Sequence, residues 1–138
     1  MKIHTTNYTD TFITVAEDCQ ATAGEIPPVK ADAKTIAGIQ FEMIGQHPYQ
    51  FTSDDVIFET YAIRHDLSKS EYEPARKDFF SKGQACLRSS PLAKRYGWGI
   101  HHDAAGKVAL VGFGTEQYNK MAADKSLQVV KAMRTKRG

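Results

Sequence analysis

The chain has 138 residues, of which 41% are hydrophobic and 25% are charged. This length and composition fit one folded domain, residues 1–138, and exclude an intrinsically disordered chain. No apolar run approaches the roughly 20 residues of a membrane-spanning helix. Residues 1–7 lack the apolar centre of a signal peptide, and two cysteines, Cys19 and Cys86, do not make a disulfide framework. We expect a cytoplasmic protein without membrane contact, in which residues 134–138 form a frayed basic tail.

Charge is distributed unevenly along the chain. Residues 1–66 carry 4 basic and 10 acidic side chains, whereas residues 67–138 carry 14 basic and 6 acidic ones. Two stretches, 79–102 and 125–138, contain no acidic residue. Either the basic part is a face for phosphate or nucleic acid, or it folds against the acidic part and cancels its charge. The sequence pI of about 8.5 is low for a nucleic-acid-binding domain, so we do not favour nucleic acid as the partner.

The first half of the chain shows the patterns of a strand, a loop and a helix. They are a β-branched run, a pair of prolines and apolar residues at helical spacing, and they cover 11–15, 23–28 and 35–46. The next segment is ambiguous. Thr52 and the carboxylates of Asp54 and Asp55 are typical of a helix start, but Val56–Phe58 favours a strand. The sequence leaves helix and strand open for Asp54–Ile63.

The second half predicts a β-hairpin among short helices. Residues 96–102 and 107–113 are rich in strand formers, and Asp103–Gly106 between them suits a type I turn. Ser90-Pro91 predicts one helical turn with proline at its first position. The other predicted elements are helices over 70–82, 115–123 and 126–133 and a strand over 85–88. Together these elements predict an α+β fold: a small antiparallel sheet around the central hairpin, with helices packed on one face.

Three motifs resemble functional sites but have simpler structural explanations. Gly112-Phe113-Gly114 lacks the third glycine and the βαβ unit of a dinucleotide site. His101 and His102 are neighbours on a strand, so their side chains point to opposite faces and do not readily share a metal ion. In a helix Asp55 and Glu59 share one face, yet carboxylates are ordinary near a helix start. We therefore expect no metal and no cofactor.

Cys86 is the stronger of the two cysteines as a reactive group. A contact between Cys86 and His101 or His102 on the hairpin would activate the thiol as a nucleophile. No third orienting group is visible, and a free cysteine is more often a small core residue. Cys86 and His101 are accordingly only weak candidates for catalytic residues.

The segment Lys82–His102 carries the clearest pattern of a ligand site. Arginine offers a fork of donors to phosphate or carboxylate, and serine hydroxyls at a helix start add neutral donors. Tyr96 and Trp98 share one strand face and form either a stacking platform or part of the core. The candidate ligand-binding residues are Arg88, Ser89, Ser90, Lys94, Arg95, Tyr96 and Trp98.

Several motifs occur in an order that resembles a known family. They include Thr52-Ser53-Asp54-Asp55-Val56-Ile57-Phe58, Phe80-Ser81-Lys82-Gly83-Gln84 and the string from Lys94 to Gly99. Over nearly its whole length the chain resembles a family of short, mostly bacterial, uncharacterised proteins known only as a domain of unknown function. The resemblance implies a stand-alone single domain, and it implies no activity, cofactor or catalytic residue.

The sequence thus predicts a non-catalytic binding module for a small anionic ligand held by Lys82–His102. One alternative is nucleic-acid association through the same segment and the basic residues of 131–137. A further alternative is an enzyme with Cys86 or His101 as its reactive group. The sequence does not indicate an oligomeric state.

Overall fold

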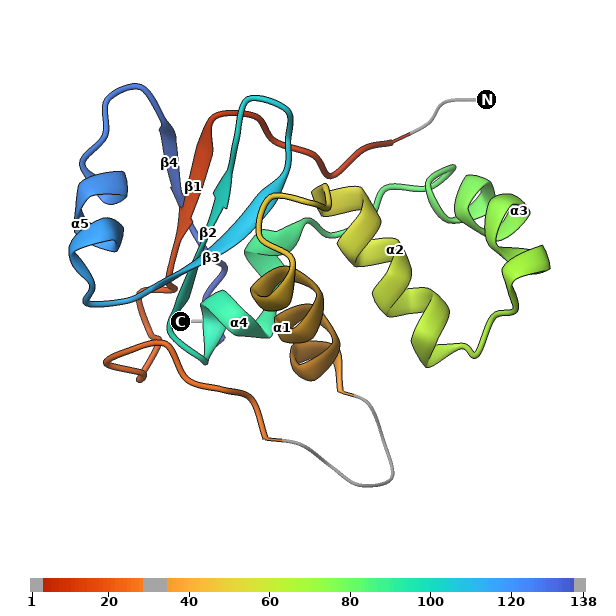
Figure 1. Cartoon of the computed structure of the whole chain (residues 1–138), viewed down its shortest axis with the longest axis horizontal. Coiled ribbons are helices and arrows are strands. Elements are labelled where there is room, and N and C mark those ends of the chain that lie inside the picture. The colour runs from red at the N-terminus through yellow and green to blue at the C-terminus, as the bar shows by residue number, and fades with distance from the viewer. Residues whose placement is uncertain (1–3, 29–34, 136–138) are drawn as a thin grey trace.

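A four-stranded sheet organises the structure, with the strand order β3-β2-β1-β4 (Figure 1). The structure is a computed structural model that describes residues 4–28 and 35–135. The strands are β1 (Thr11–Thr14), β2 (Trp98–His102), β3 (Val108–Gly112) and β4 (Gln128–Lys131). The helices of the described residues are α1 (Ile36–Gln46), α2 (Ser53–Arg64), α3 (Lys69–Phe79), α4 (Pro91–Lys94) and α5 (Glu116–Ala122). The predicted α+β fold is confirmed.

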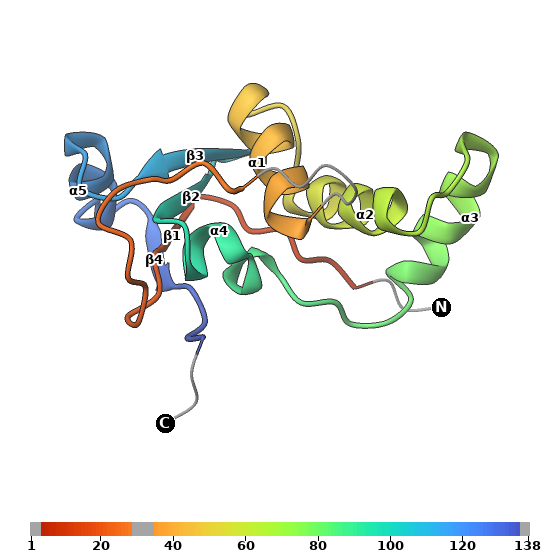
Figure 2. The ribbon, with the colours of Figure 1, turned by 90° about the horizontal axis from the view of Figure 1, so that it is seen from below.

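Helices pack on both faces of the sheet, as the view from below shows (Figure 2). α1 and α4 cover the face that carries Ile13, Ile100 and Val108. α5 covers the other face, where the ring of Tyr118 packs edge-on against Phe12 at 5.1 Å. The helix expected at 115–123 is therefore present as α5, but the prediction that all helices pack on a single face is wrong. The second face needs this cover because Phe12 and Val111 are apolar side chains that alternate with those of the main core.

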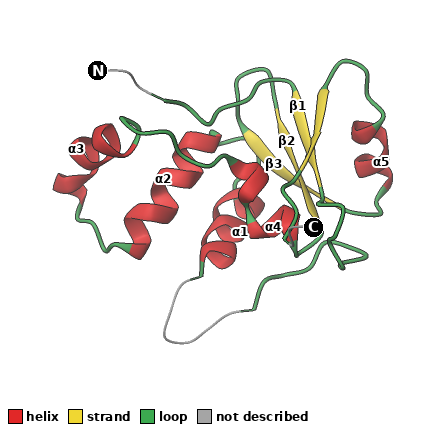
Figure 3. Cartoon of the chain, turned by 180° about the vertical axis from the view of Figure 1, so that it is seen from behind, coloured by secondary structure: helices red, strands yellow, loops and turns green. Residues whose placement is uncertain are grey.

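Helices α2 and α3 extend away from the sheet, as the view from behind also shows (Figure 3). They have a small core of their own, formed by Phe58, Ala62 and Phe80 with partly buried aromatic side chains around them. α2 also packs against α1, which joins this arm to the main core. The arm thus creates hollows beside α2 that the sheet alone would not form.

The segment whose secondary structure the sequence left open is helical. A capping box decides this: the Thr52 hydroxyl accepts from the Asp55 amide (3.2 Å), and the Asp55 carboxylate accepts from the Thr52 amide (3.0 Å). These bonds satisfy amides that a helix leaves free in its first turn. The expected hairpin, the strand at 11–15, the helices at 35–46 and 115–123 and the turn after Ser90 are also confirmed, within one or two residues at their ends.

Two predicted elements are wrong. Residues 126–133 contain a strand, β4, instead of a helix, because Val129 and Val130 pair with the open edge of β1. This pairing is parallel, so the sheet is mixed, whereas a wholly antiparallel sheet was expected. Residues 85–88 do not form a strand, and Leu87–Ser89 form a short 3₁₀ helix. Of the expected frayed tail, residues 136–138 lie outside the described part, while the Thr135 amide donates to Asp18.

His102 is a polar side chain enclosed in the main core. Its ring is fully buried, packs edge-on against Tyr8 at 5.4 Å, and has no hydrogen-bond partner among the described residues on either nitrogen. Burial of the ring lowers the pKa of His102 from 6.5 to about 4. The imidazole is therefore neutral in the folded protein at neutral pH.

We expect acid to destabilise the protein through His102. Between pH 6.5 and pH 4 the unfolded chain binds a proton on His102 that the folded chain does not, so the free energy of unfolding decreases as the pH falls through this window. The expected loss is about 2–3 kcal/mol by about pH 4.5. Urea unfolding of the wild type and of H102F, at about pH 6.5 and again at about pH 4.5, measures this loss of stability. H102F should lose distinctly less stability, and an equal loss in both proteins would contradict the assignment.

Candidate functional site

Two cavities lie on opposite sides of helix α2. The first, of about 630 Å³, is lined by one stripe of the helix with Asp55, Glu59 and Ile63, and we call it the acidic pocket. The second, of about 510 Å³, is lined by the opposite stripe with Ile57, Tyr61 and Arg64, and we call it the apolar pocket. A helix places residues three and four apart on one side, so both stripes follow from the sequence of α2 once it is helical.

The apolar pocket lies between α1, α2 and the segment 85–91. Its walls are mainly hydrophobic side chains, namely Ile36, Ile57, Tyr61, Phe79 and Leu87. Arg64 and His65 line it where α2 ends, and the His65 ring lies against Tyr61 with 4.2 Å between the ring centroids and a tilt of 36°. Arg64 is exposed and makes no ion pair with any described residue. The pocket therefore combines apolar walls with a guanidinium group that forms no ion pair with a described residue.

Cys86 also lines the apolar pocket, but its partner is a tyrosine. The Cys86 sulfur lies 3.3 Å from the Tyr8 hydroxyl, and this hydrogen bond, with burial, raises the pKa of Tyr8. His101 is on the sheet face of Gly99 and Val111, where its Nδ1 lies 2.8 Å from the Tyr49 hydroxyl. The structure therefore does not bring Cys86 and His101 together.

Ser89 and Ser90 are the two predicted ligand-binding residues that line the apolar pocket. The Ser90 hydroxyl donates to the buried Gln40 side chain (2.6 Å) and accepts from the Leu92 amide, which caps α4. The Ser89 hydroxyl donates to the Met133 sulfur (3.1 Å). Both hydroxyls thus connect this segment to neighbouring elements as well as lining the pocket.

Arg88 holds the chain that follows β4. Its Nε donates to the Lys131 carbonyl (2.7 Å), and its own carbonyl accepts from the Met133 amide (2.8 Å). This pair of bonds fastens the C-terminal strand to the 3₁₀ helix.

The other four predicted residues lie away from the apolar pocket. Lys94 and Arg95 line a small hollow of about 270 Å³ beside Thr135. Tyr96 packs against the main core. Trp98 donates from its indole nitrogen to the Glu25 carbonyl (2.8 Å) and packs on Phe41. Tyr96 and Trp98, the expected stacking platform, are thus partly buried against the main core, and the seven predicted residues do not meet in one site.

Arg64 is the functional candidate that sequence reasoning missed. It precedes the segment Lys82–His102 by about twenty residues, and the sequence shows it only as a basic residue near the end of a possible helix. Its one sequence signal is the stripe Ile57, Tyr61 and Arg64, which marks an amphipathic helix side ending in a cation.

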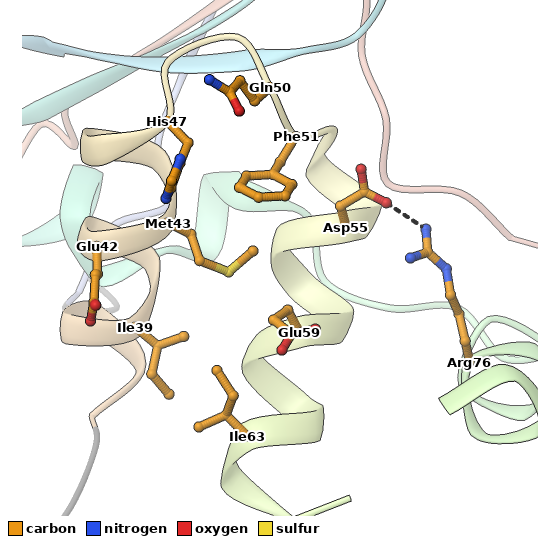
Figure 4. Close-up of a pocket in the computed structure, with 10 residues that line it drawn as sticks. All are labelled: Ile39, Glu42, Met43, His47, Gln50, Phe51, Asp55, Glu59, Ile63 and Arg76. Carbon is orange, nitrogen blue, oxygen red and sulfur yellow. Dashed lines mark hydrogen bonds and ion pairs between the residues drawn. The ribbon is translucent and has the colours of Figure 1, made fainter. Parts of the chain in front are cut away.

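The acidic pocket lies between α1 and α2 (Figure 4). Asp55 turns toward Arg76 of α3 and pairs with it at 2.9 Å. Burial opposes the ionisation of Asp55, but hydrogen bonds from Thr52 and Arg76 outweigh it and lower the pKa of Asp55. The expectation that Asp55 and Glu59 share a helix side is met, since both line this pocket.

The chain matches a known family along nearly its entire length. The Family of unknown function (DUF6157) matches residues 3–138. The chain belongs to this family. No curated protein and no solved structure matches this DUF6157 protein. None of the helices in residues 4–28 and 35–135 is long and apolar enough to cross a membrane. The same ranges hold no group of three or more His, Cys, Asp or Glu side chains placed to bind a metal ion.

We predict that Arg88 of this DUF6157 protein stabilises the fold and does not bind ligand. R88M removes the charged donor to the Lys131 carbonyl and should lower the free energy of unfolding by about 1 kcal/mol. Urea unfolding measures the change. K94M is the matched control, because the Lys94 ammonium group has no hydrogen-bond partner among the described residues, and it should change stability much less. An R88M variant as stable as K94M would contradict the structural role.

Proposed function

We propose that the protein is a non-catalytic binding module for a small organic anion with an apolar body. The ligand lies in the apolar pocket, where residues 85–91 of the segment Lys82–His102 face helix α2. Its anionic group pairs with Arg64, and its apolar part contacts Ile57, Tyr61 and Leu87.

The observation that carries this proposal is an uncommitted guanidinium on a largely apolar cavity of about 510 Å³. Small-molecule sites are typically cavities of roughly 300–1,000 Å³ with apolar walls and a few polar groups that orient the ligand. A guanidinium binds a carboxylate or phosphate through two parallel hydrogen bonds. Binding would remove apolar surface from water and give Arg64 an ionic partner, which it lacks among the described residues.

The segment Lys82–His102 supplies part of the wall of this site, but it does not supply the positive charge that pairs with the ligand. Cys86 and Ser89 reach the pocket, whereas the cation comes from α2. Among the alternatives, nucleic-acid association has less support, because two cations of its basic surface have protein partners: Arg88 bonds to a carbonyl and Lys131 pairs with Glu17. An enzyme built on Cys86 has less support because its thiol faces Tyr8.

We place this function in the bacterial cytoplasm. Cys19 and Cys86 are both free thiols, which a reducing compartment preserves.

Substitution of Arg64 tests the proposal. Isothermal titration with hexanoate should show saturable binding to the wild type, and R64Q should weaken it about tenfold or more, because the anion loses a charged double donor. K77Q removes an exposed cation of α3 outside the pocket and should bind like the wild type. Absence of binding to the wild type, or equal binding to R64Q, would refute the site.

Cys86 serves as an internal reporter of occupancy. Saturating hexanoate should slow alkylation of Cys86 by iodoacetamide severalfold, because the ligand covers the pocket wall that carries the sulfur. Cys19 does not line this pocket, so its rate should stay unchanged. Peptide mass spectrometry over a time course measures both rates in one sample. An unprotected Cys86 would place the bound hexanoate elsewhere.

A further inference from the structure

We propose that the acidic pocket binds a second ligand of opposite charge, an organic cation in which a primary ammonium group is attached to an apolar body. This site lies on the other side of α2 from the apolar pocket and does not depend on the anion site.

The acidic pocket has apolar walls and carboxylates that come from different helices. Ile39 and Met43 of α1 and Ile63 of α2 lie in the space between the two helices, and Phe51 closes one end (Figure 4). Glu42 comes from α1 and Glu59 from α2, with these apolar side chains between them (Figure 4). A ligand that fills the space therefore meets hydrophobic surface along its length and a carboxylate on either side.

The charges of this pocket do not cancel. Asp55 is neutralised by Arg76, at 2.9 Å, so this pair adds no net charge. Glu59 accepts a hydrogen bond from the Tyr72 hydroxyl (2.8 Å), which is neutral and leaves the negative charge in place. Glu42 is exposed and makes no ion pair with a described residue. Two uncompensated carboxylates thus attract a cation into a cavity of about 630 Å³.

The chemistry favours an ammonium compound over a metal ion. A metal ion needs several oxygen or nitrogen ligands at 2–3 Å, and the described residues contain no such group. A metal ion would also leave the apolar surface of Met43, Phe51 and Ile63 unused. An alkylammonium uses both features, because its methylene groups contact these side chains and its charge meets a carboxylate.

A matched pair of probes with the same hydrocarbon body tests the proposal. Isothermal titration should show that hexylamine, protonated at neutral pH, binds the wild type and binds more weakly as salt is added. The double variant E42Q/E59Q should weaken this binding about tenfold or more. Gln at position 59 retains an acceptor for Tyr72, so the fold should be preserved. The control E73Q/E116Q removes two exposed carboxylates outside the pocket and should bind like the wild type.

Backbone amide chemical shifts locate the bound amine. Hexylamine should shift residues 39–43 and 59–63, and hexanoate should not. Lack of hexylamine binding, equal binding to E42Q/E59Q, or shifts confined to other residues would each overturn the proposal. The two sites fail independently: R64Q should retain hexylamine binding, and E42Q/E59Q should retain hexanoate binding.

Discussion

Two adjacent carboxylates at the start of helix α2 hold three separate parts of the chain together. Asp54 accepts hydrogen bonds from the Thr5 hydroxyl and the Thr6 amide, both at 2.7 Å, which fastens the N-terminal segment. Asp55 completes the capping box with Thr52 and pairs with Arg76, which fastens α3. Both carboxylates also lie near the positive end of the helix dipole. The position of α2 relative to the N-terminal segment and to α3 depends on these bonds, and Arg76 and Phe79 of α3 line the two pockets.

The two proposed sites share α2 as a common wall but use opposite chemistry. One side of the helix carries Glu59 among apolar residues of the acidic pocket, and the other side ends at Arg64 in the apolar pocket. A cation near the C-terminal end of a helix is itself favoured by the helix dipole, so the dipole stabilises Arg64 there although it has no ion pair with a described residue. Rotation of α2 about its axis would move both charges out of their pockets. The bonds of Asp54 to the N-terminal segment and of Asp55 to Arg76 oppose this rotation and therefore matter for binding on either side.

The basic segment 82–102 illustrates how packing redirects side chains that look like ligand donors. Ser90 donates a hydrogen bond to the Gln40 side chain, Arg88 donates to the carbonyl of Lys131, and Trp98 donates to the carbonyl of Glu25. Each of these partners is distant in sequence, and each satisfies a polar group that packing partly removes from water. The polar side chains of this segment thus serve several separate structural contacts instead of one ligand site.

Local sequence patterns determined much of the secondary structure, because caps, prolines and hydrophobic spacing act over a few residues. Thr52 with Asp55, Ser90 with Pro91, and the alternation through β2 are such patterns. The shared side of Asp55 and Glu59 followed from helical spacing, on the condition that this segment is a helix. Tertiary structure decided three outcomes that no local pattern contains. Val129 and Val130 form a strand that pairs with the edge of β1, and α5 covers the second face of the sheet. Arg64 and Cys86 line the same pocket. These outcomes depend on which surfaces remain open once the core has formed, and an open strand edge or an apolar face recruits residues by burial and hydrogen bonding irrespective of their distance in sequence.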